Sequence, residues 1–213
     1  MNRQEAQREL LNRLIQTECA CRQMGFRLIA GADEAGRGPL AGPVVAACVI
    51  MPEDGYVLGV NDSKKLTEEK REELYEKIIK AAIAYRTGIV GQDVIDEINI
   101  LKATRLAFKQ AVESLDTAPD YLYTDRIDKL EVSMPWTPVT KGDATIYSVA
   151  AASIIAKVTR DRLMREYDKQ YPEYGFAKHK GYGTAEHMEA IRRYGPTPLH
   201  RRSFLKSLGA GDE

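Results

Sequence analysis

The sequence predicts an α/β domain, and three observations carry that prediction. Short apolar runs rich in β-branched residues, such as 44–51, are typical of buried strands. Between them lie segments with the apolar spacing of helices, such as 4–22 and 68–82. Two neighbouring carboxylates, Asp33 and Glu34, follow an apolar run and precede glycines and prolines, which cannot continue regular structure. Alternation of the two patterns indicates one sheet covered by helices.

The order of the elements follows from these patterns. Strands are predicted over 27–36, 44–51, 85–91, 120–124 and 136–140. Helices are predicted over 4–22, 68–82, 94–115 with a break near Asn99, 145–170 and 185–194. The turn between the first two strands is too short for a crossover, so these strands should be antiparallel neighbours. The first half of the helix over 145–170 is small and apolar almost all round, so its backbone should lie close to the sheet.

Asp33 and Glu34 are candidate metal ligands. Successive side chains of a strand point to opposite faces, so both carboxylates reach one place only if the strand ends or bulges there, which Gly36 and Gly38 allow. Adjacent carboxylates repel until a divalent ion lies between or beside them. A solvated turn is the alternative for an isolated pair, but the following strand would place these acids beside the middle of a sheet.

Two further acids lie at predicted element boundaries. Asp125 follows the strand over 120–124 and is another strand-end carboxylate. Asp143 precedes the long helix, and it has a structural alternative because Asp is a favoured N-cap. On the residues alone, capping is the better explanation of Asp143.

Composition sets the broad class. The 213 residues, 44% hydrophobic and 29% charged, suffice for one well-buried domain. No apolar run is long enough to span a membrane, and the first residues lack the apolar region of a signal peptide, so a cytoplasmic protein is expected. Cys19, Cys21 and Cys48 lack metal-site spacing and are expected to be free thiols.

The charge is balanced overall but uneven along the chain. The formal net charge is zero, whereas residues 157–206 hold 12 Lys and Arg against 6 Asp and Glu, a net of +6. This asymmetry suits an acidic metal centre beside a basic flank that meets phosphates, and an ordinary solvated surface is the alternative. Likewise, Ser63, Lys64 and Lys65 suit either a phosphate grip or a solvated loop, and the basic, tyrosine-containing tail suits either a nucleic-acid backbone or a merely basic surface.

Six segments, taken together and in order, strongly resemble the bacterial ribonuclease HII family. They are residues 31–43, 62–66, 141–143, 150–162, 180–184 and 200–204. The resemblance covers nearly the whole chain from Leu28 to Phe204. The Gly36-Arg37-Gly38 stretch points to the type-two rather than the type-three enzymes.

The resemblance implies a ribonuclease-H-like fold, with a mixed central β-sheet flanked by helices and a small helical C-terminal addition. On this basis residues 1–26 are an N-terminal packing helix, 27–170 the catalytic domain and 171–213 a C-terminal substrate-binding extension. The four metal-binding acids implied are Asp33, Glu34, Asp125 and Asp143.

The resemblance also implies how the substrate is read. The backbone of Gly36, Arg37 and Gly38 and the hydroxyl of Tyr182 would recognise the 2′-OH of a ribonucleotide at its junction with DNA. Flanking phosphates would contact Ser63, Lys64, Lys65, Lys180, Arg201 and Arg202.

The sequence departs from the family at one position, because the third acid is often followed by glycine and here Arg126 follows Asp125. Asp120 and Asp128 lie nearby as rival ligands. Asp125 fits best, since the apolar, aromatic run 121–123 makes it the strand-end acid.

The expected function is that of a metal-dependent endonuclease. It would hydrolyse RNA in RNA/DNA hybrids and cut on the 5′ side of ribonucleotides embedded in duplex DNA, leaving a 3′-hydroxyl, with Mn²⁺ or Mg²⁺ as cofactor. A monomer is expected. The alternatives are a non-catalytic hybrid-binding module, which should have lost an acid, and a junction resolvase or transposase-type nuclease, which should lack the Gly-Arg-Gly and Lys-Gly-Tyr-Gly motifs.

Overall fold

The central sheet runs through the middle of the computed structural model, which describes residues 2–206. Within these residues it has five strands in the order β3-β2-β1-β4-β5. Their bounds are β1 Ile29–Ala35, β2 Val44–Ile50, β3 Ala84–Val90, β4 Tyr121–Asp125 and β5 Trp136–Val139. β1 pairs antiparallel with β2, as the short turn predicts, and β2 pairs antiparallel with β3. β1 and β4 are parallel, as are β4 and β5, which confirms the mixed sheet.

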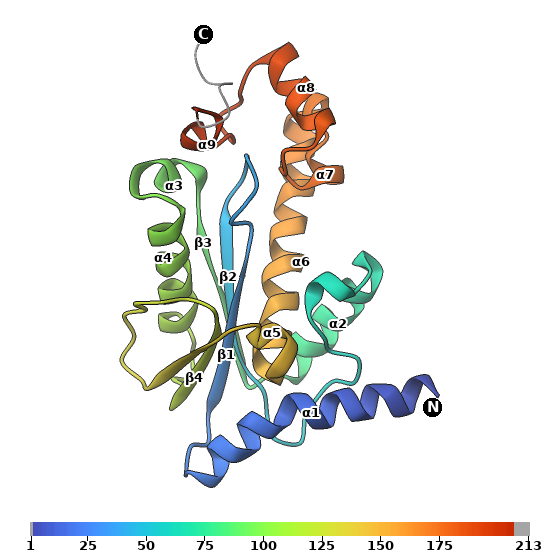
Figure 1. Ribbon diagram of the computed structural model, residues 1–213, viewed down its shortest axis with the longest axis vertical. Helices are drawn as coiled ribbons and strands as arrows, with labels where there is room; N and C mark the ends of the chain where they lie inside the picture. The colour runs from blue at the N-terminus through green and yellow to red at the C-terminus, as the bar shows by residue number, and fades with distance from the viewer. Residues whose placement is uncertain (1, 207–213) are drawn as a thin grey trace.

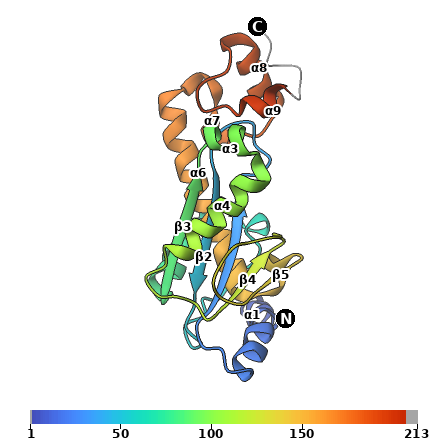
Figure 2. The same ribbon diagram turned by 90° about the vertical axis from the view of Figure 1, so that its left-hand side faces the viewer.

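Helices cover both faces of this sheet (Figure 1). One face carries α3 and α4, and the other carries α6 with α2 beside it, while α1 crosses the end of the molecule near the start of β1 (Figures 1 and 2). The bounds are α1 Arg3–Gln23, α2 Glu68–Ala81, α3 Gln92–Ile98, α4 Ile100–Glu113, α5 Gly142–Thr145 and α6 Tyr147–Gln170. Two short 3₁₀ turns lie at Ser63–Lys65 and Pro172–Tyr174. The predicted α/β class with helices on both sides is confirmed.

The backbone of α6 lies against β1 at Gly31. A Cβ at this glycine would lie 2.2 Å from the backbone carbon of Ser148 and 2.3 Å from the Val149 nitrogen, so only glycine fits. The predicted close approach of the long helix to the sheet is therefore confirmed. It fixes the height of α6 relative to the end of β1, where Asp33 and Glu34 lie.

Two boundaries depend on cap geometry. Thr67 accepts a hydrogen bond from the Lys70 backbone N–H and begins α2, as predicted. The predicted break near Asn99 is also present, since Asn99 has a φ of 70° and its side chain accepts from the first turn of α4.

The prediction of one helix over 145–170 is wrong at its start. The short helix α5 ends at Thr145, Ile146 is extended, and α6 begins at Tyr147. Because α5 starts one residue before Asp143 and Lys141 holds its N-cap position in a left-handed conformation, Asp143 is not an N-cap. The structural alternative for this acid is therefore excluded.

A small helical unit follows α6, as predicted, and consists of α7 Phe176–His179, α8 Ala185–Tyr194 and α9 Arg202–Lys206. Figure 1 shows it around the C-terminal end of α6, with α7 alongside that helix. The loop after β1 joins it by backbone hydrogen bonds, from Leu40 N–H to the Gly181 carbonyl and from Arg201 N–H to the Leu40 carbonyl, both 2.8 Å. The end of the predicted extension, residues 207–213, lies outside the described residues. Within 2–206, no helix combines the length and apolar character needed to cross a bilayer.

Candidate functional site

The first two acids of the site lie at the carboxyl end of β1. Ala32 is in register with Thr124 of the parallel strand β4, so Asp33 and Asp125 each follow a paired position on neighbouring strands. Side chains in register on neighbouring strands share a face, and strands lie about 4.8 Å apart. Asp125 is the last residue of β4. The sheet itself thus brings these two acids together.

α5 adds the fourth acid from the next connection. The Gly142 backbone N–H donates to Asp125 Oδ1 at 2.8 Å, which anchors the start of α5 over the end of β4. Asp143, next in the chain, is 4% exposed. The Lys64 Nζ donates to Asp143 Oδ2 at 3.1 Å. A turn predicted as a phosphate grip therefore reaches into the acid site.

The acids of this site disfavour one another's charge. Burial raises the pKa of Asp33 well above its usual value, and the charges of Glu34, Asp125 and Asp143 raise it further. Burial also raises the pKa of Glu34 despite the opposing effect of Arg37, whose Nη1 lies 3.3 Å from Glu34 Oε1. For Asp143, burial raises the pKa and outweighs the contact with Lys64. A bound cation would therefore stabilise the ionised form of these acids.

The donor set fits divalent cations. Glu34 Oε2 is buried and has no hydrogen-bond partner among residues 2–206, which is costly unless a ligand satisfies it. All candidate donors are carboxylate oxygens, the ligands that Mg²⁺ and Mn²⁺ take. Among residues 2–206, no three His, Cys, Asp or Glu side chains already converge on one ion position. Lys64 and Arg37 instead pair with Asp143 and Glu34, where a cation's charge would act.

The rival acids near Asp125 have other partners. The Asp120 carboxylate accepts from the backbone N–H groups of Arg27 and Leu28, at 2.7 and 3.0 Å, and so ties the start of β4 to the start of β1. Asp128 is exposed and pairs with Arg105 at 2.8 Å. Neither acid belongs to the electrostatic group around Asp33.

The Gly36-Arg37-Gly38 loop follows the first two acids and is held from behind by two buried arginines. Gly36 has a φ of 94°, and a Cβ there would lie 2.1 Å from Arg160 Nε. Arg201 donates from Nη2 to the Gly36 carbonyl at 2.6 Å and from Nη1 to the Arg37 carbonyl at 2.9 Å. A trans peptide points its N–H away from its carbonyl, and no peptide described here is cis, so the N–H groups of Arg37 and Gly38 face away from Arg201.

Tyr182 lies beside this loop. A Cβ at Gly38 would lie 3.8 Å from Tyr182 Cε1, which is ordinary contact distance. The tyrosine is 46% exposed. The structure therefore brings the glycine loop and this tyrosine together next to the acids.

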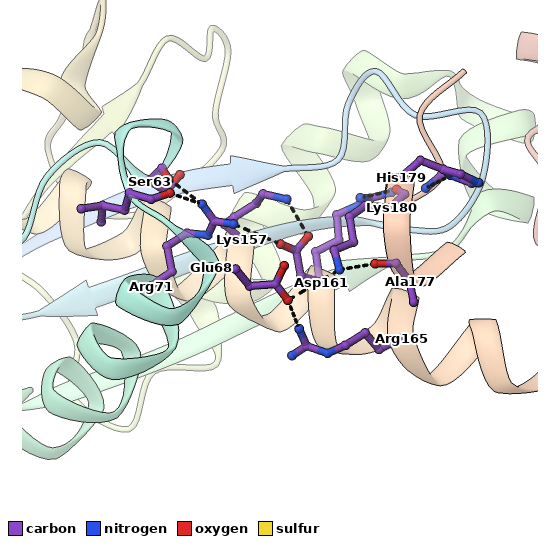
Figure 3. Close-up of polar contacts among 12 residues, drawn as sticks. Ser63, Glu68, Arg71, Lys157, Asp161, Arg165, Ala177, His179 and Lys180 are labelled. Atoms are coloured by element: carbon purple, nitrogen blue, oxygen red, sulfur yellow. Dashed lines mark hydrogen bonds and ion pairs between the residues drawn. The ribbon is translucent and has the colours of Figure 1, made fainter. Parts of the chain in front are cut away.

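The predicted phosphate contacts divide into two groups. Lys64, Lys65 and Arg202 are exposed. Ser63, Lys180 and Arg201 are buried, at 5%, 9% and 0% exposed, and the structure does not support direct phosphate contacts by these three. Lys180 Nζ donates to the Ala177 carbonyl and lies 3.7 Å from Glu68 Oε1, as Figure 3 shows. The Lys180 and Arg201 side chains donate to backbone carbonyls inside the protein, and Ser63 is enclosed and bonded through its backbone N–H and carbonyl.

Sequence reasoning missed the buried groups that hold the site. Arg160 of α6 is 1% exposed and donates to the carbonyls of Pro43, Lys180 and Ala41 at 2.9 to 3.0 Å. Further along, Asp161 accepts from Lys157 at 2.6 Å and lies 3.8 Å from Arg71, which in turn binds the Ser63 carbonyl (Figure 3). The charge pattern of the sequence gave no sign of these roles, because arginine is usually exposed.

The fold and the site define a class of protein: a metal-dependent nuclease of the ribonuclease H type, with carboxylates gathered at the carboxyl ends of central strands. Comparison with known proteins gives the family. Residues 30–207 match the family model for ribonuclease HII, and the chain belongs to the ribonuclease HII family. The ribonuclease HII of Acetivibrio thermocellus is 58% identical over 186 residues, which cover 87% of this chain and 73% of that protein.

Solved structures agree with this assignment. Ribonuclease H2 from Pyrococcus horikoshii OT3 is similar with a TM-score of 0.72 and 32% identity, over 86% of this chain and 96% of that one. Bst-RNase HIII in complex with Mn²⁺ has a TM-score of 0.70 over 90% of this chain and 71% of that one. At 19% identity, the latter likeness supports the fold alone.

Proposed function

We propose that this protein hydrolyses the RNA strand of RNA/DNA hybrids and cuts duplex DNA on the 5′ side of a single embedded ribonucleotide, leaving a 3′-hydroxyl and a 5′-phosphate. The observation that carries the proposal is the contact between the Gly38 position and the Tyr182 ring, immediately beyond the acids Asp33 and Glu34. A loop and a tyrosine that could bind one sugar hydroxyl thus lie next to carboxylates that could bind metal ions.

Asp33, Glu34, Asp125 and Asp143 would hold two divalent ions, Mg²⁺ or Mn²⁺. Bound divalent ions supply Lewis acidity that activates water and offsets the charge that develops on the leaving oxygen of a phosphodiester. The carboxylates themselves bind and orient rather than attack. The Gly142 N–H, through its 2.8 Å hydrogen bond, fixes the orientation of the Asp125 carboxylate.

Selection of a ribonucleotide would come from the loop and the tyrosine. The 2′-OH both donates and accepts hydrogen bonds, and it distinguishes RNA from DNA at one position. The outward N–H groups of Arg37 and Gly38 would donate to it, and the exposed Tyr182 hydroxyl would complete the contact. Arg201 supports this arrangement because it binds the carbonyls on the opposite side of the same peptides.

The remaining predictions extend this proposal. Residues 1–26 would act as a packing helix, 27–170 as the catalytic domain and 171–213 as the substrate-binding extension. Lys64, Lys65 and Arg202, the exposed members of the predicted set, would contact flanking phosphates. We infer that the protein acts as a monomer in the cytoplasm and supports ribonucleotide removal from DNA, and the three free cysteines suit a reducing compartment.

The test uses three substrates: an RNA/DNA hybrid, a DNA duplex with one ribonucleotide, and an all-DNA four-way junction. With Mn²⁺ or Mg²⁺, we expect cleavage of the first two, and EDTA should stop it. Binding without cleavage would favour a hybrid-binding module, and cleavage of the junction would favour a different nuclease of the superfamily.

Asp125→Asn identifies the ligand set. Loss of this carboxylate should reduce metal-dependent cleavage by roughly 10²- to 10³-fold, by analogy with the loss of one strong transition-state contact. Asp116→Asn is the matched control, because Asp116 is an exposed acid in the loop after α4 that pairs with Arg86 of β3. Normal cleavage by Asp125→Asn, with both variants folded by circular dichroism, would contradict the assignment.

A further inference from the structure

A surface groove of ≈ 610 Å³ opens beside the acid site. Its walls include Arg37, Arg126 and Thr140. These residues follow β1, β4 and β5, the three strands that run parallel, so the groove lies at the carboxyl ends of parallel strands. Ligands of α/β sheets characteristically bind at this edge. Arg126 directly follows Asp125, so the groove adjoins the acids.

The groove carries positive charge that acidic side chains of the protein only partly neutralise. Arg126 is exposed and forms no hydrogen bond or ion pair with any residue from 2 to 206. Arg37 pairs with Glu34 at 3.3 Å, but its side chain is still 44% exposed. Asp128 also lines the groove, yet its Oδ1 is held by Arg105 at 2.8 Å. The groove therefore presents the unpaired guanidinium group of Arg126 beside that of Arg37, which is paired on one side but still partly exposed.

Apolar surface lies next to these cations. Leu101, at the start of α4, is 39% exposed and lines the same groove, as does the exposed Pro138. A sugar-phosphate backbone presents this combination of charged oxygens and less polar sugar faces. Arginine suits phosphate because its planar donors match two phosphate oxygens at once.

We propose that this groove binds the sugar-phosphate backbone of the cleaved strand beside the scissile phosphodiester, with Arg126 as the phosphate contact. The inference rests on the proposed function. Phosphates of one strand recur about every 3.4 Å along a duplex axis, so a strand bound at the acids also presents phosphates to the groove, which the contact between Arg37 and Glu34 joins to the acid site.

The test measures KM and kcat for an RNA/DNA hybrid, with Mn²⁺ or Mg²⁺, over a series of KCl concentrations. Each phosphate contact adds to the salt dependence of binding. Arg126→Ala should raise KM about five- to tenfold at low salt and reduce the slope of log KM against log salt by roughly one, with kcat affected less. Arg126→Lys should keep most of the slope, because it keeps the charge.

Lys129→Ala is the matched control. Lys129 lies in the same loop and is exposed, but it lines a different hollow with Lys109 and Glu131. We expect its KM and salt slope to equal those of the unmodified protein. If Arg126→Ala also equals it, the inference is wrong while cleavage by the unmodified protein upholds the proposed function. If the unmodified protein cleaves no ribonucleotide-containing substrate, both fall.

Discussion

The acid site and the pair of arginines behind the adjoining loop, Arg160 and Arg201, both bury charged groups, but the two regions differ in whether the protein supplies partners for those groups. Asp33 and Glu34 have raised pKa values, and Glu34 Oε2 has no hydrogen-bond partner in the described part of the chain. Arg160 and Arg201, in contrast, donate from Nε and both Nη atoms to backbone carbonyls. The acids would be stabilised by a bound cation, whereas the arginines already donate to carbonyl groups of the protein.

The difference separates structural from binding roles among buried charges. A buried charge that makes all its hydrogen bonds stabilises one arrangement of the chain. Its removal leaves the partner groups buried without hydrogen bonds, which destabilises the protein. A buried charge beside others of the same sign destabilises the chain until a counterion binds. Three experiments test how buried charged or titratable groups are satisfied in these parts of the molecule.

The largest effect should come from Arg201→Met. This change leaves the carbonyls of Gly36, Arg37 and Gly42 without donors, and we expect the free energy of unfolding to fall by about 3 to 5 kcal/mol. Urea denaturation followed by circular dichroism measures it.

Arg202→Met is the control for that experiment. Arg202 is the next residue and is exposed, so its replacement should change the free energy of unfolding by less than about 0.5 kcal/mol. Similar losses from the two variants would show that Arg201 is not the anchor of the loop.

Acid should weaken the C-terminal unit through two buried histidines. Burial lowers the pKa of His187 to about 4, and burial with the neighbouring His187 lowers that of His200 to about 4. The unfolded chain takes up protons below pH 6.5 that the folded chain refuses, so stability falls from pH 6.5 toward pH 4, by about 3 kcal/mol or less for each histidine. Urea unfolding at several pH values measures this loss.

The hydrogen bonds predict a single tautomer for each ring. The Thr197 N–H donates to His200 Nδ1 at 2.9 Å, so His200 carries its proton on Nε2, which lies 3.0 Å from His187 Nε2. His187 must then donate from Nδ1 to the Tyr182 carbonyl, at 2.9 Å. Imidazole ¹⁵N shifts at pH 6 should show both rings neutral in these tautomers. A folded-state pKa near 6.5 for either ring would contradict the prediction.

Local patterns in the sequence were sufficient for most of the fold. The short turn before Val44 required antiparallel strands, and the small residues that face Gly31 required a helix close to the sheet. The break at Ile146 was not predictable in the same way. It accompanies the hydrogen bond from Gly142 to Asp125, a contact between residues 17 positions apart that local spacing does not encode.

The site residues also differ in whether local sequence predicts their place. Acids at strand ends stand out in a sequence because carboxylates are rare beside buried apolar runs, and the structure brings Asp33 and Asp125 to neighbouring strands. Arg201 and Lys180 looked like surface cations because their type usually is exposed. Their burial depends on carbonyls of a loop more than 130 residues away, or on a turn of α7, and only the tertiary structure places those carbonyls.

The smallest effect, and one of opposite sign, should come from Asp33→Asn. The amide keeps an oxygen that can accept from the Glu34 N–H, as Asp33 Oδ1 does at 2.8 Å, but it removes a charge that the neighbouring acids oppose. Without divalent ions at pH 7, we expect the free energy of unfolding to rise by about 1 to 2 kcal/mol and Tm by about 3 to 6 °C. Because the folded pKa of Asp33 is raised, the unmodified protein should make up this difference as the pH falls through that pKa.

Divalent ions should reverse the order of the two proteins. If Asp33 is a metal ligand as proposed, Mg²⁺ or Mn²⁺ should raise the Tm of the unmodified protein more than that of Asp33→Asn. Asp128→Asn is the control, because Arg105 lowers the pKa of this exposed carboxyl and its loss should cost a few tenths of a kcal/mol, with or without metal. If Asp33→Asn destabilised the metal-free protein as well, the acids would already be satisfied by the chain, and the contrast with Arg160 and Arg201 would disappear.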